Sequence, residues 1–285
     1  MSHAKIRVQE VLKHIGVYQR LKASRAYDLY WSFKDRSVSA WIRNGTAFYR
    51  GLLSGFKRGC LVFDVGANDG SKTAVFLRLG ARVVAVEPDQ TNQTIIRDKF
   101  LRFRLTPKPV TILGKALSDE VSVATMWIDQ PGSATNTLSQ KWVETLKEDD
   151  ARFGFNHEFR QTITVETTTL DNLIAAHGIP FFIKIDVEGH ELSVLRGLHS
   201  AVPYLSFEVN LPEFLSDAQE CVRILDGLDG RGKFNYVSED YELGLAMSEW
   251  QNSVSFSKAL SQCNQRTIEV IWKTPVDENI NTARH

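Results

Sequence analysis

Two glycines follow one apolar run of this sequence and an acidic residue follows the next. Residues of these types at this spacing could bind a nucleoside. The run Leu61–Val65 leads into Gly66, and Gly70 precedes a predicted helix over Ser71–Leu79. Glu87 ends the next apolar run, about 20 residues after Gly66, where a carboxylate binds the ribose hydroxyls in nucleotide-binding α/β folds. Because glycines let the backbone approach a ligand closely, this spacing predicts a ligand that contains adenosine.

The charge of the turn distinguishes between adenosine ligands. A pyrophosphate-binding G-x-G-x-x-G turn would have glycine at Asn68, and carboxylates stand at Asp64 and Asp69, where they would repel phosphate. S-adenosylmethionine carries an ammonium and a sulfonium and no phosphate, so we predict it as the cofactor. The residues predicted to bind it are Asp64, Gly66, Ala67, Asn68, Asp69, Gly70, Glu87, Pro88 and, further along the chain, Asp186.

A second set of charged residues lies in and after the apolar run Phe181–Asp186. A strand this apolar belongs in the middle of a parallel sheet, so Lys184 within it needs a partner. Asp186 should emerge at the carboxyl edge of the sheet, where ligands bind. Glu208, inside the next apolar run Tyr204–Val209, could pair with Lys184 on the neighbouring strand. A location beside the ligand edge favours a functional role over a purely structural ion pair.

Carboxylates and a histidine continue this segment beyond the strand. Glu188 and Glu191 are expected to open the next helix, where the helix dipole alone would favour carboxylates, so capping is the alternative to chemistry. A hydroxyl that accepts a methyl group must lose its proton, and we expect Asp186 and Glu188 to orient or deprotonate it. The predicted catalytic residues are Asp186, Glu188, Lys184, Glu208 and His190. Lys184 and Glu208 are expected to lie at the bottom of the site and to stabilise its shape.

The same carboxylates raise the question of a metal ion. Asp186, Glu188 and Glu208 could supply oxygen ligands to a divalent cation that lowers the pKa of an acceptor hydroxyl. No separate Asp/Asn pair with ligand spacing stands out, so a metal is considered but not predicted. The three cysteines lie far apart and form no CxxC pair, which indicates neither a thiolate zinc site nor a disulfide framework.

Short apolar runs alternate with helical patterns from residue 60 onward, which is typical of βαβ units and a parallel sheet. The seven strands predicted for one sheet are Leu61–Val65, Arg82–Val86, Val110–Gly114, Phe181–Asp186, Tyr204–Val209, Phe234–Val237 and Thr267–Trp272. Extra strands are expected at Val121–Ile128 and Thr162–Thr168. The fold class is therefore α/β and Rossmann-like.

Two predicted insertions, 129–161 and 241–264, interrupt this pattern in a catalytic domain over residues 59–285. The first is far longer than an ordinary connection and predicts a lid or substrate loop. Candidate contacts to a methyl acceptor are Asn136, Thr137, Trp142, Phe153, Phe155, His157, Tyr241 and Trp250. Ordinary loop packing is the alternative for these side chains.

Residues 1–58 are expected to form a basic helical extension, because they hold twelve Lys/Arg against three Asp/Glu in a chain of zero net charge. Such a segment could contact an anionic substrate, a membrane surface or nucleic acid, but we favour docking on the acidic remainder of its own chain or plain solvation. We predict no nucleic-acid partner and make no prediction of the oligomeric state. Without a long apolar run or a signal-peptide pattern, we expect a soluble, cytoplasmic protein.

The motifs together resemble the FkbM family of class I methyltransferases, from about Val62 to Val209. The matching pieces are Phe63–Gly70, Val86–Pro88, Lys115–Asp119, Thr168–Leu173, Ile183–Glu191 and Phe207–Val209. The resemblance implies a seven-stranded sheet with an antiparallel last strand, and methyl transfer from S-adenosylmethionine, commonly to a hydroxyl of a sugar, polyketide or related metabolite. It also implies that Ala116, Leu117 and Ser118 lie near the adenine. The residue at the position of His190 varies in that family, which argues against an indispensable base there.

The resulting prediction is an S-adenosylmethionine-dependent methyltransferase that methylates a hydroxyl of a sugar, glycan or secondary metabolite. One alternative is a nucleic-acid-binding or -modifying methyltransferase that uses the basic N-terminal segment. Another is a non-catalytic scaffold that retains the fold. The intact Asp64, Gly66, Gly70 and Glu87 argue against a scaffold, because only ligand binding requires this combination.

Overall fold

A seven-stranded sheet forms the centre of the protein. The computed structural model describes residues 36–100, 110–149, 152, 157–238 and 244–275. Within them, the strands follow the spatial order β3-β2-β1-β7-β8-β10-β9. Their bounds are β1 Leu61–Val65, β2 Arg82–Val86, β3 Val110–Leu113, β7 Phe182–Ile185, β8 Tyr204–Asn210, β9 Lys233–Ser238 and β10 Thr267–Lys273. All seven strands predicted for the sheet are confirmed, with ends shifted by no more than a residue.

Strand direction divides the sheet into two parts. Pairs from β3 through β8 are parallel, as βαβ connections require. The last strand, β10, runs antiparallel between β8 and β9. The α/β, Rossmann-like fold class and its antiparallel final strand are therefore confirmed.

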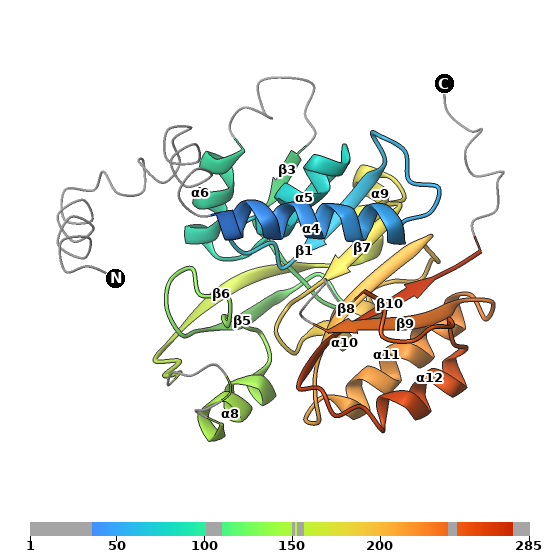
Figure 1. Cartoon of the computed structure of the whole chain (residues 1–285). Helices are drawn as coiled ribbons and strands as arrows, with labels where there is room; N and C mark the ends of the chain where they lie inside the picture. Colours follow the sequence, from blue (N-terminus) through green and yellow to red (C-terminus); the bar gives the residue numbers. More distant parts are fainter. Residues whose placement is uncertain (1–35, 101–109, 150–151, 153–156, 239–243, 276–285) are drawn as a thin grey trace.

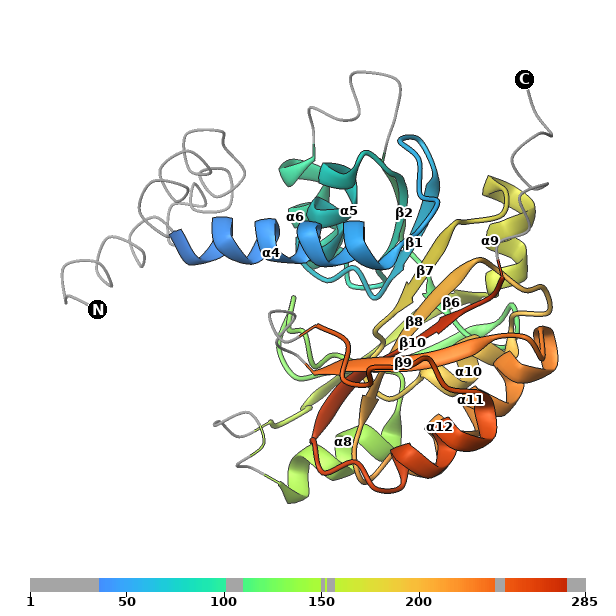
Figure 2. The same ribbon diagram turned by 45° about the vertical axis from the view of Figure 1, so that its right-hand side comes forward.

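Helices cover both faces of this sheet, as Figures 1 and 2 show for α4 on one side and for α11 and α12 on the other. Their bounds are α4 Arg36–Leu52, α5 Ser71–Leu79, α6 Gln90–Lys99, α9 Leu170–His177, α10 Glu191–Arg196, α11 Leu215–Leu228 and α12 Ser253–Leu260. Side chains of α4 and α5 form one core cluster with the sheet, and those of α9 to α12 belong to a larger one.

The first strand shows how the alternation of a strand separates these faces. Phe63 and Val65 pack into the larger cluster, whereas Val62 packs toward α4 and α5. Since successive side chains point to opposite faces, Asp64 shares the face of Val62. Lys184 is its neighbour in register on β7, so both charged side chains lie on the α4 face.

A second, three-stranded sheet of order β4-β6-β5 lies beside the first. It comprises β4 Ala116–Leu117, β5 Val123–Ile128 and β6 Gln161–Thr168. Both extra strands expected at Val121–Ile128 and Thr162–Thr168 are confirmed, the first of them beginning two residues later than predicted. The stretch 129–161 is not wholly irregular, because it contains α8 at Gln140–Glu148. Trp142, on α8, is fully buried in the larger core cluster. Ser139 caps this helix, since its side chain accepts a hydrogen bond from Trp142 N.

Some predicted features lie outside the described residues. They are residues 1–35 of the basic extension and the candidate acceptor contacts Phe153, Phe155 and Tyr241. The remainder of the extension includes α4, which packs on α5. Tyr49 of α4 and Leu53, directly after it, belong to the core. None of the helices in the described parts of the chain is long and apolar enough to cross a lipid bilayer.

Candidate active site

A cavity with about 540 Å³ of empty volume lies at the carboxyl ends of β1, β2 and β7. This size is usual for a small-molecule site. Of the residues predicted to bind the cofactor, Gly66, Asn68, Glu87, Pro88, Ala116, Leu117 and Asp186 line it. Of those predicted to be catalytic, Asp186, Glu188 and His190 line it. We refer to this space as the first cavity.

Five of the predicted cofactor residues do not line the first cavity: Asp64, Ala67, Asp69, Gly70 and Ser118. The Asp64 carboxylate is buried and accepts a hydrogen bond from Thr73 Oγ1 at 2.5 Å. Asp69 Oδ1 accepts from Ser71 N, and its other oxygen lies 3.6 Å from Lys99 Nζ. The acidic side chains that line the first cavity are therefore Glu87, Asp186 and Glu188, and not Asp64 and Asp69.

Gly66 is needed for the approach of two strand ends. Its φ is +76°, and a Cβ there would lie 1.7 Å from the carbonyl oxygen of Asp186. Asp186 N also donates to Val65 O at 3.0 Å. We predicted that Gly66 makes room for a ligand, but its first role is to let the turn after β1 contact the end of β7, which brings Asp186 to the cavity.

Glu87 is held by backbone amides at the end of β2. Its Oε2 accepts from Asn68 N at 2.7 Å and its Oε1 from Asp89 N at 2.8 Å. Burial raises the pKa of this carboxyl to about 8, although both amide hydrogen bonds lower it. The ionised form, which prevails above pH about 8, offers about four acceptor positions, and two of them remain for ribose hydroxyls.

Asp89 holds the start of the 129–161 stretch beside the first cavity through hydrogen bonds. Its Oδ2 accepts from Gly132 N at 2.7 Å and from Asn136 Nδ2 at 3.0 Å. Asn136 and Thr137 line the cavity, and Thr137 Oγ1 donates to the carbonyl oxygen of Glu188 at 2.7 Å. Sequence reasoning missed Asp89, although its place directly after Glu87 and Pro88 was a usable signal.

Carboxylates converge where β7 and β8 end. Oxygens of Asp186, Glu188 and Glu208 lie within 4.8 Å of one another. The expected ion pair between Lys184 and Glu208 is wrong, since Lys184 Nζ pairs with Asp186 Oδ2 at 2.5 Å. The register explains the difference: Lys184 faces Ser206 on β8, and Asp186 follows two residues later on the same face.

Glu188 lies in the turn before α10 and not in the helix, which begins at Glu191. Its φ of 55° is unusual for a residue with a side chain. Burial and the neighbouring charge of Asp186 raise its pKa well above the usual value. Glu191 holds this turn, because its Oε1 accepts from the amides of Val187 and Gly189, and burial raises its pKa to about 7.

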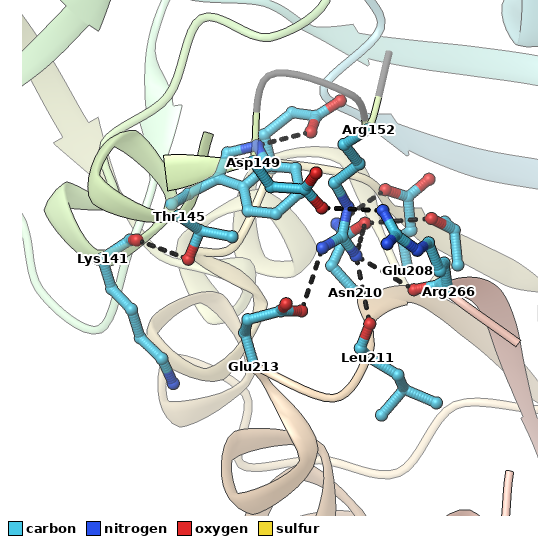
Figure 3. A network of polar contacts seen from close by, with 12 residues as sticks. Lys141, Thr145, Asp149, Arg152, Glu208, Asn210, Leu211, Glu213 and Arg266 are labelled. Carbon is cyan, nitrogen blue, oxygen red and sulfur yellow. Dashed lines mark hydrogen bonds and ion pairs between the residues drawn. The ribbon is translucent and has the colours of Figure 1, made fainter. Parts of the chain in front are cut away.

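A polar network behind the carboxylates holds two of them in place (Figure 3). Trp142 Nε1 donates to Glu188 Oε2 at 2.9 Å, and Asn210 Nδ2 donates to Glu208 Oε1 at 3.2 Å. The Arg152 guanidinium lies 5.0 Å from the Trp142 ring and donates to Leu211 O at 3.2 Å and to Arg266 O at 3.1 Å. Trp142, a predicted acceptor contact, is therefore a core residue that positions Glu188.

His190 directly precedes α10 and contacts the segment that follows β4. Its Nε2 is 3.2 Å from the Oγ of Ser118, the first residue after β4. Burial lowers the pKa of His190, and the charge of Asp119 opposes this shift. The contact associates His190 with the segment that the family resemblance places near the adenine.

A second cavity, with about 620 Å³ of empty volume, lies on the α4 face and shares Asp186 with the first. Among its lining residues, Lys184, Asp186 and Glu208 were predicted, whereas Trp41, Lys72, Ser238, Thr267 and Glu269 were not. Lys72 was predicted only as part of a helix and Glu269 only as part of the last strand. Their juxtaposition depends on how α4, α5 and β10 pack together.

Two other candidate acceptor contacts have different partners. His157 Nδ1 lies 3.2 Å from Asp129 Oδ2, and its side chain is almost fully buried. Trp250 lies under Lys273, whose Nζ is 4.1 Å from the ring centroid. Neither side chain lines the first or the second cavity. Loop packing, the alternative stated for both, describes them better.

The carboxylates Asp186, Glu188 and Glu208 offer oxygen ligands of the kind that Mg²⁺ and Ca²⁺ prefer. Lys184 already places one positive charge against Asp186. The same group of oxygens also suits a sulfonium or an acceptor hydroxyl, so a cation site is one use of this geometry among several.

The strand order, the antiparallel β10 and a ligand cavity at the carboxyl edge define a Rossmann-like class I methyltransferase. A family model described as the methyltransferase FkbM domain matches residues 64–228, more than half of the chain, and the chain therefore belongs to the FkbM methyltransferase family. It is an S-adenosylmethionine-dependent methyltransferase. No curated protein matches the sequence.

Several solved structures are similar to this chain at low identity. The C-terminal domain of precorrin-6Y C5,15-methyltransferase from Rhodobacter capsulatus is 13% identical, covering 79% of this chain and 85% of its own, with a TM-score of 0.39. A TehB-like S-adenosylmethionine-dependent methyltransferase from Corynebacterium glutamicum is 8% identical, covering 88% and 100%, with a TM-score of 0.41. An O-methyltransferase from Bacillus cereus in complex with S-adenosylhomocysteine is 13% identical, covering 87% and 97%, with a TM-score of 0.35.

Proposed function

We propose that this methyltransferase methylates a hydroxyl group of a sugar, glycan or related polyhydroxylated metabolite. The observation that carries the proposal is the convergence of Asp186, Glu188 and Glu208 between the two cavities. When bound, S-adenosylmethionine supplies an electrophilic methyl group. The protein must then orient the acceptor and remove one proton from it.

The first cavity fits the adenosine half of the cofactor. Glu87 would accept hydrogen bonds from the ribose hydroxyls, since two backbone amides already orient its carboxylate. Ala116 and Leu117 would contact the adenine from the end of the second sheet. Asn68 and Asp186 line the same space from the turn after β1 and from the end of β7.

Proton removal is assigned to Asp186 and Glu188. Burial raises the pKa of Glu188, which makes its carboxylate a stronger base than one in water. The Glu208 carboxyl behaves in the same way, as burial and the charge of Asp186 raise its pKa. Lys184, paired with Asp186, fixes the orientation of that carboxylate and keeps one positive charge in the cluster.

The second cavity is the proposed location of the acceptor. Glu208 and Glu269 can accept hydrogen bonds from hydroxyls, while Ser238 and Thr267 can donate or accept. Trp41, with 37% of its surface exposed, offers a ring face against which a sugar ring could pack. Because acidic side chains outnumber basic ones here, an uncharged acceptor fits better than a phosphorylated one.

Two substitutions test this assignment. Full-length protein with Asp186→Asn or Glu188→Gln is assayed for transfer of labelled methyl from S-adenosylmethionine to a panel of sugars and polyols, beside wild type and the exposed control Glu148→Gln. We expect turnover to fall by about 100-fold or more in both site variants and to stay near wild type in the control. Near-normal turnover in both site variants would overturn the assignment, and exclusive methylation of nitrogen acceptors would overturn the proposed acceptor class.

A further inference from the structure

The second cavity is large enough to hold more than an acceptor group. Asp186 lines both cavities, so a ligand in the first cavity that reaches Asp186 has the second cavity on the other side of that residue. S-adenosylmethionine has adenosine at one end and an amino-acid group, with an ammonium and a carboxylate, at the other. If its adenosine lies in the first cavity as proposed above, its amino-acid end needs a counter-charge beyond Asp186.

Two lysines line the second cavity, and they differ in their surroundings. Lys184 Nζ is 2.5 Å from Asp186 Oδ2, and 3% of its side-chain surface is exposed. Lys72 Nζ is 4.0 Å from Glu269 Oε2, and 18% of its side-chain surface is exposed. Lys184 thus makes a short ion pair inside the protein, whereas the Lys72 ammonium is accessible from the cavity.

Lys72 is surrounded by groups that hold it in the cavity wall. Its Nζ lies 5.4 Å from the Trp41 ring centroid and 5.9 Å from that of Tyr49, both on α4. Tyr49 OH in turn donates to Glu269 Oε1 at 3.0 Å. The charges of Lys184, Asp186 and Asp64 also act on the Lys72 amine from the sheet. An ammonium removed from water in this way gains from a carboxylate ligand.

The place of Lys72 in the chain supports an anionic ligand. It is the second residue of α5, which directly follows the Gly66–Gly70 turn, and the first amide of this helix, Ser71 N, already donates to Asp69 Oδ1 at 2.9 Å. The positive end of this nine-residue helix favours negative charge near its first turn. The side chain and the helix end therefore favour the same sign of charge on a ligand.

We propose that Lys72 binds the carboxylate at the amino-acid end of S-adenosylmethionine, in the part of the second cavity next to Asp186. This inference rests on the proposed location of adenosine in the first cavity. It makes Lys72 a cofactor-binding residue, and it leaves Trp41, Ser238 and Thr267 to the acceptor.

The test compares two ligands that differ only in the carboxylate. Calorimetry on the full chain measures the affinity for S-adenosylhomocysteine and for its decarboxylated analogue, S-adenosyl-3-thiopropylamine. We expect wild type to bind S-adenosylhomocysteine at least about tenfold more tightly, since a charge-assisted hydrogen bond contributes that much. In Lys72→Met this preference should disappear, because S-adenosylhomocysteine binds more weakly while the analogue binds as before.

Lys141→Met is the matched control. Lys141 also combines an ion pair, 2.9 Å to Asp217, with a ring contact, 4.3 Å to the Phe214 centroid, yet it lines neither cavity. This variant should keep the full preference. Lys72→Arg should keep most of it, because it retains the positive charge.

The outcomes separate this inference from the proposed function. A preference that persists in Lys72→Met, or that is missing in wild type while both ligands bind, overturns the role of Lys72 and leaves the methyltransferase function intact. If wild type binds neither ligand, the location of adenosine fails as well, and the role of Lys72 with it. Should Lys72→Met not fold, Lys72→Gln and Lys72→Arg decide the question, since the first must lose the preference and the second must keep it.

Discussion

The two cavities that meet at Asp186 are walled in different ways. In the first, main-chain groups set the geometry: Gly66 contacts the carbonyl of Asp186, and two backbone amides hold Glu87. In the second, the walls are charged side chains from separate elements, such as Lys72 on α5 and Glu269 on β10. The first cavity therefore depends on backbone geometry that few substitutions tolerate, whereas side-chain changes in the second cavity can alter the ligand and leave the fold intact.

The largest expected effect is that of Gly66→Ala. A Cβ would lie 1.7 Å from the Asp186 carbonyl oxygen, so the ends of β1 and β7 must separate. We expect the free energy of unfolding to fall by about 3 kcal/mol or more, with loss of S-adenosylhomocysteine binding. Chemical denaturation and calorimetry measure the two effects.

Gly51→Ala is the control for this substitution, because Gly51 lies in α4 and a Cβ added there would meet no atom within 4 Å. It should be neutral or slightly stabilising, by about 0.5–1 kcal/mol. If Gly66→Ala behaved like Gly51→Ala, the backbone contact would not be the feature that builds the first cavity.

Glu87→Gln should weaken the binding of S-adenosylhomocysteine and of its decarboxylated analogue to the same extent. One carboxylate oxygen becomes an amide NH₂, which would face a backbone N–H of Asn68 or Asp89 in place of accepting from it. We expect roughly 2 kcal/mol, or about 30-fold, lower affinity for S-adenosylhomocysteine and for its decarboxylated analogue alike. The exposed Glu166→Gln is the control, and a loss confined to one ligand would contradict the separation of the cavities.

Trp142→Phe should reduce turnover more than binding. It removes the indole hydrogen bond to Glu188 Oε2 and leaves an aromatic ring in the core. We expect about tenfold lower turnover with little change in S-adenosylhomocysteine affinity, because Glu188 keeps its place but not its orientation. Equal losses in turnover and in affinity would mean that Trp142 supports the first cavity as a whole.

The smallest effect concerns pH. Burial lowers the pKa of Lys72 to about 8, and the protonated form binds a carboxylate. The preference for S-adenosylhomocysteine over the analogue should therefore be full at pH 7 and decline as the pH rises through about 8, by roughly fivefold at pH 9. Glu269, Tyr49, Lys184, Asp186 and Asp64 act on the same amine, and Lys72→Arg controls for them because its guanidinium stays charged. A preference independent of pH in wild type would separate Lys72 from the carboxylate.

Much of the fold was predictable because a buried parallel strand is a continuous apolar run. Leu61–Val65 and Arg82–Val86 match the structure at both ends. The helix Ser71–Leu79 also matches, since a glycine in the left-handed conformation bounds it on each side. In contrast, α8 escaped prediction because no glycine bounds it and the long stretch around it, from 129 to 161, has no regular period.

The candidate site was predictable where chemistry follows the end of a strand. Glu87 and Asp186 were placed correctly at the carboxyl edge, because parallel strands end together there. For Asp64 the sequence could not show which face of the sheet its side chain would occupy, because that depends on the packing of α4 and α5, and its role in cofactor binding stays a prediction. The partner of Lys184 was missed for a related reason, because register between β7 and β8 is a property of the assembled sheet.

By itself, the sequence determined the strands, the glycine-bearing turn after β1 and the acidic segment after β7, since these depend on neighbours in the chain. Only the tertiary structure decided that Lys72, Trp41 and Glu269 share one cavity and that Trp142 holds Glu188. These contacts join residues from distant parts of the chain, and packing of the core brings such residues together without leaving a local pattern of residue types to mark them.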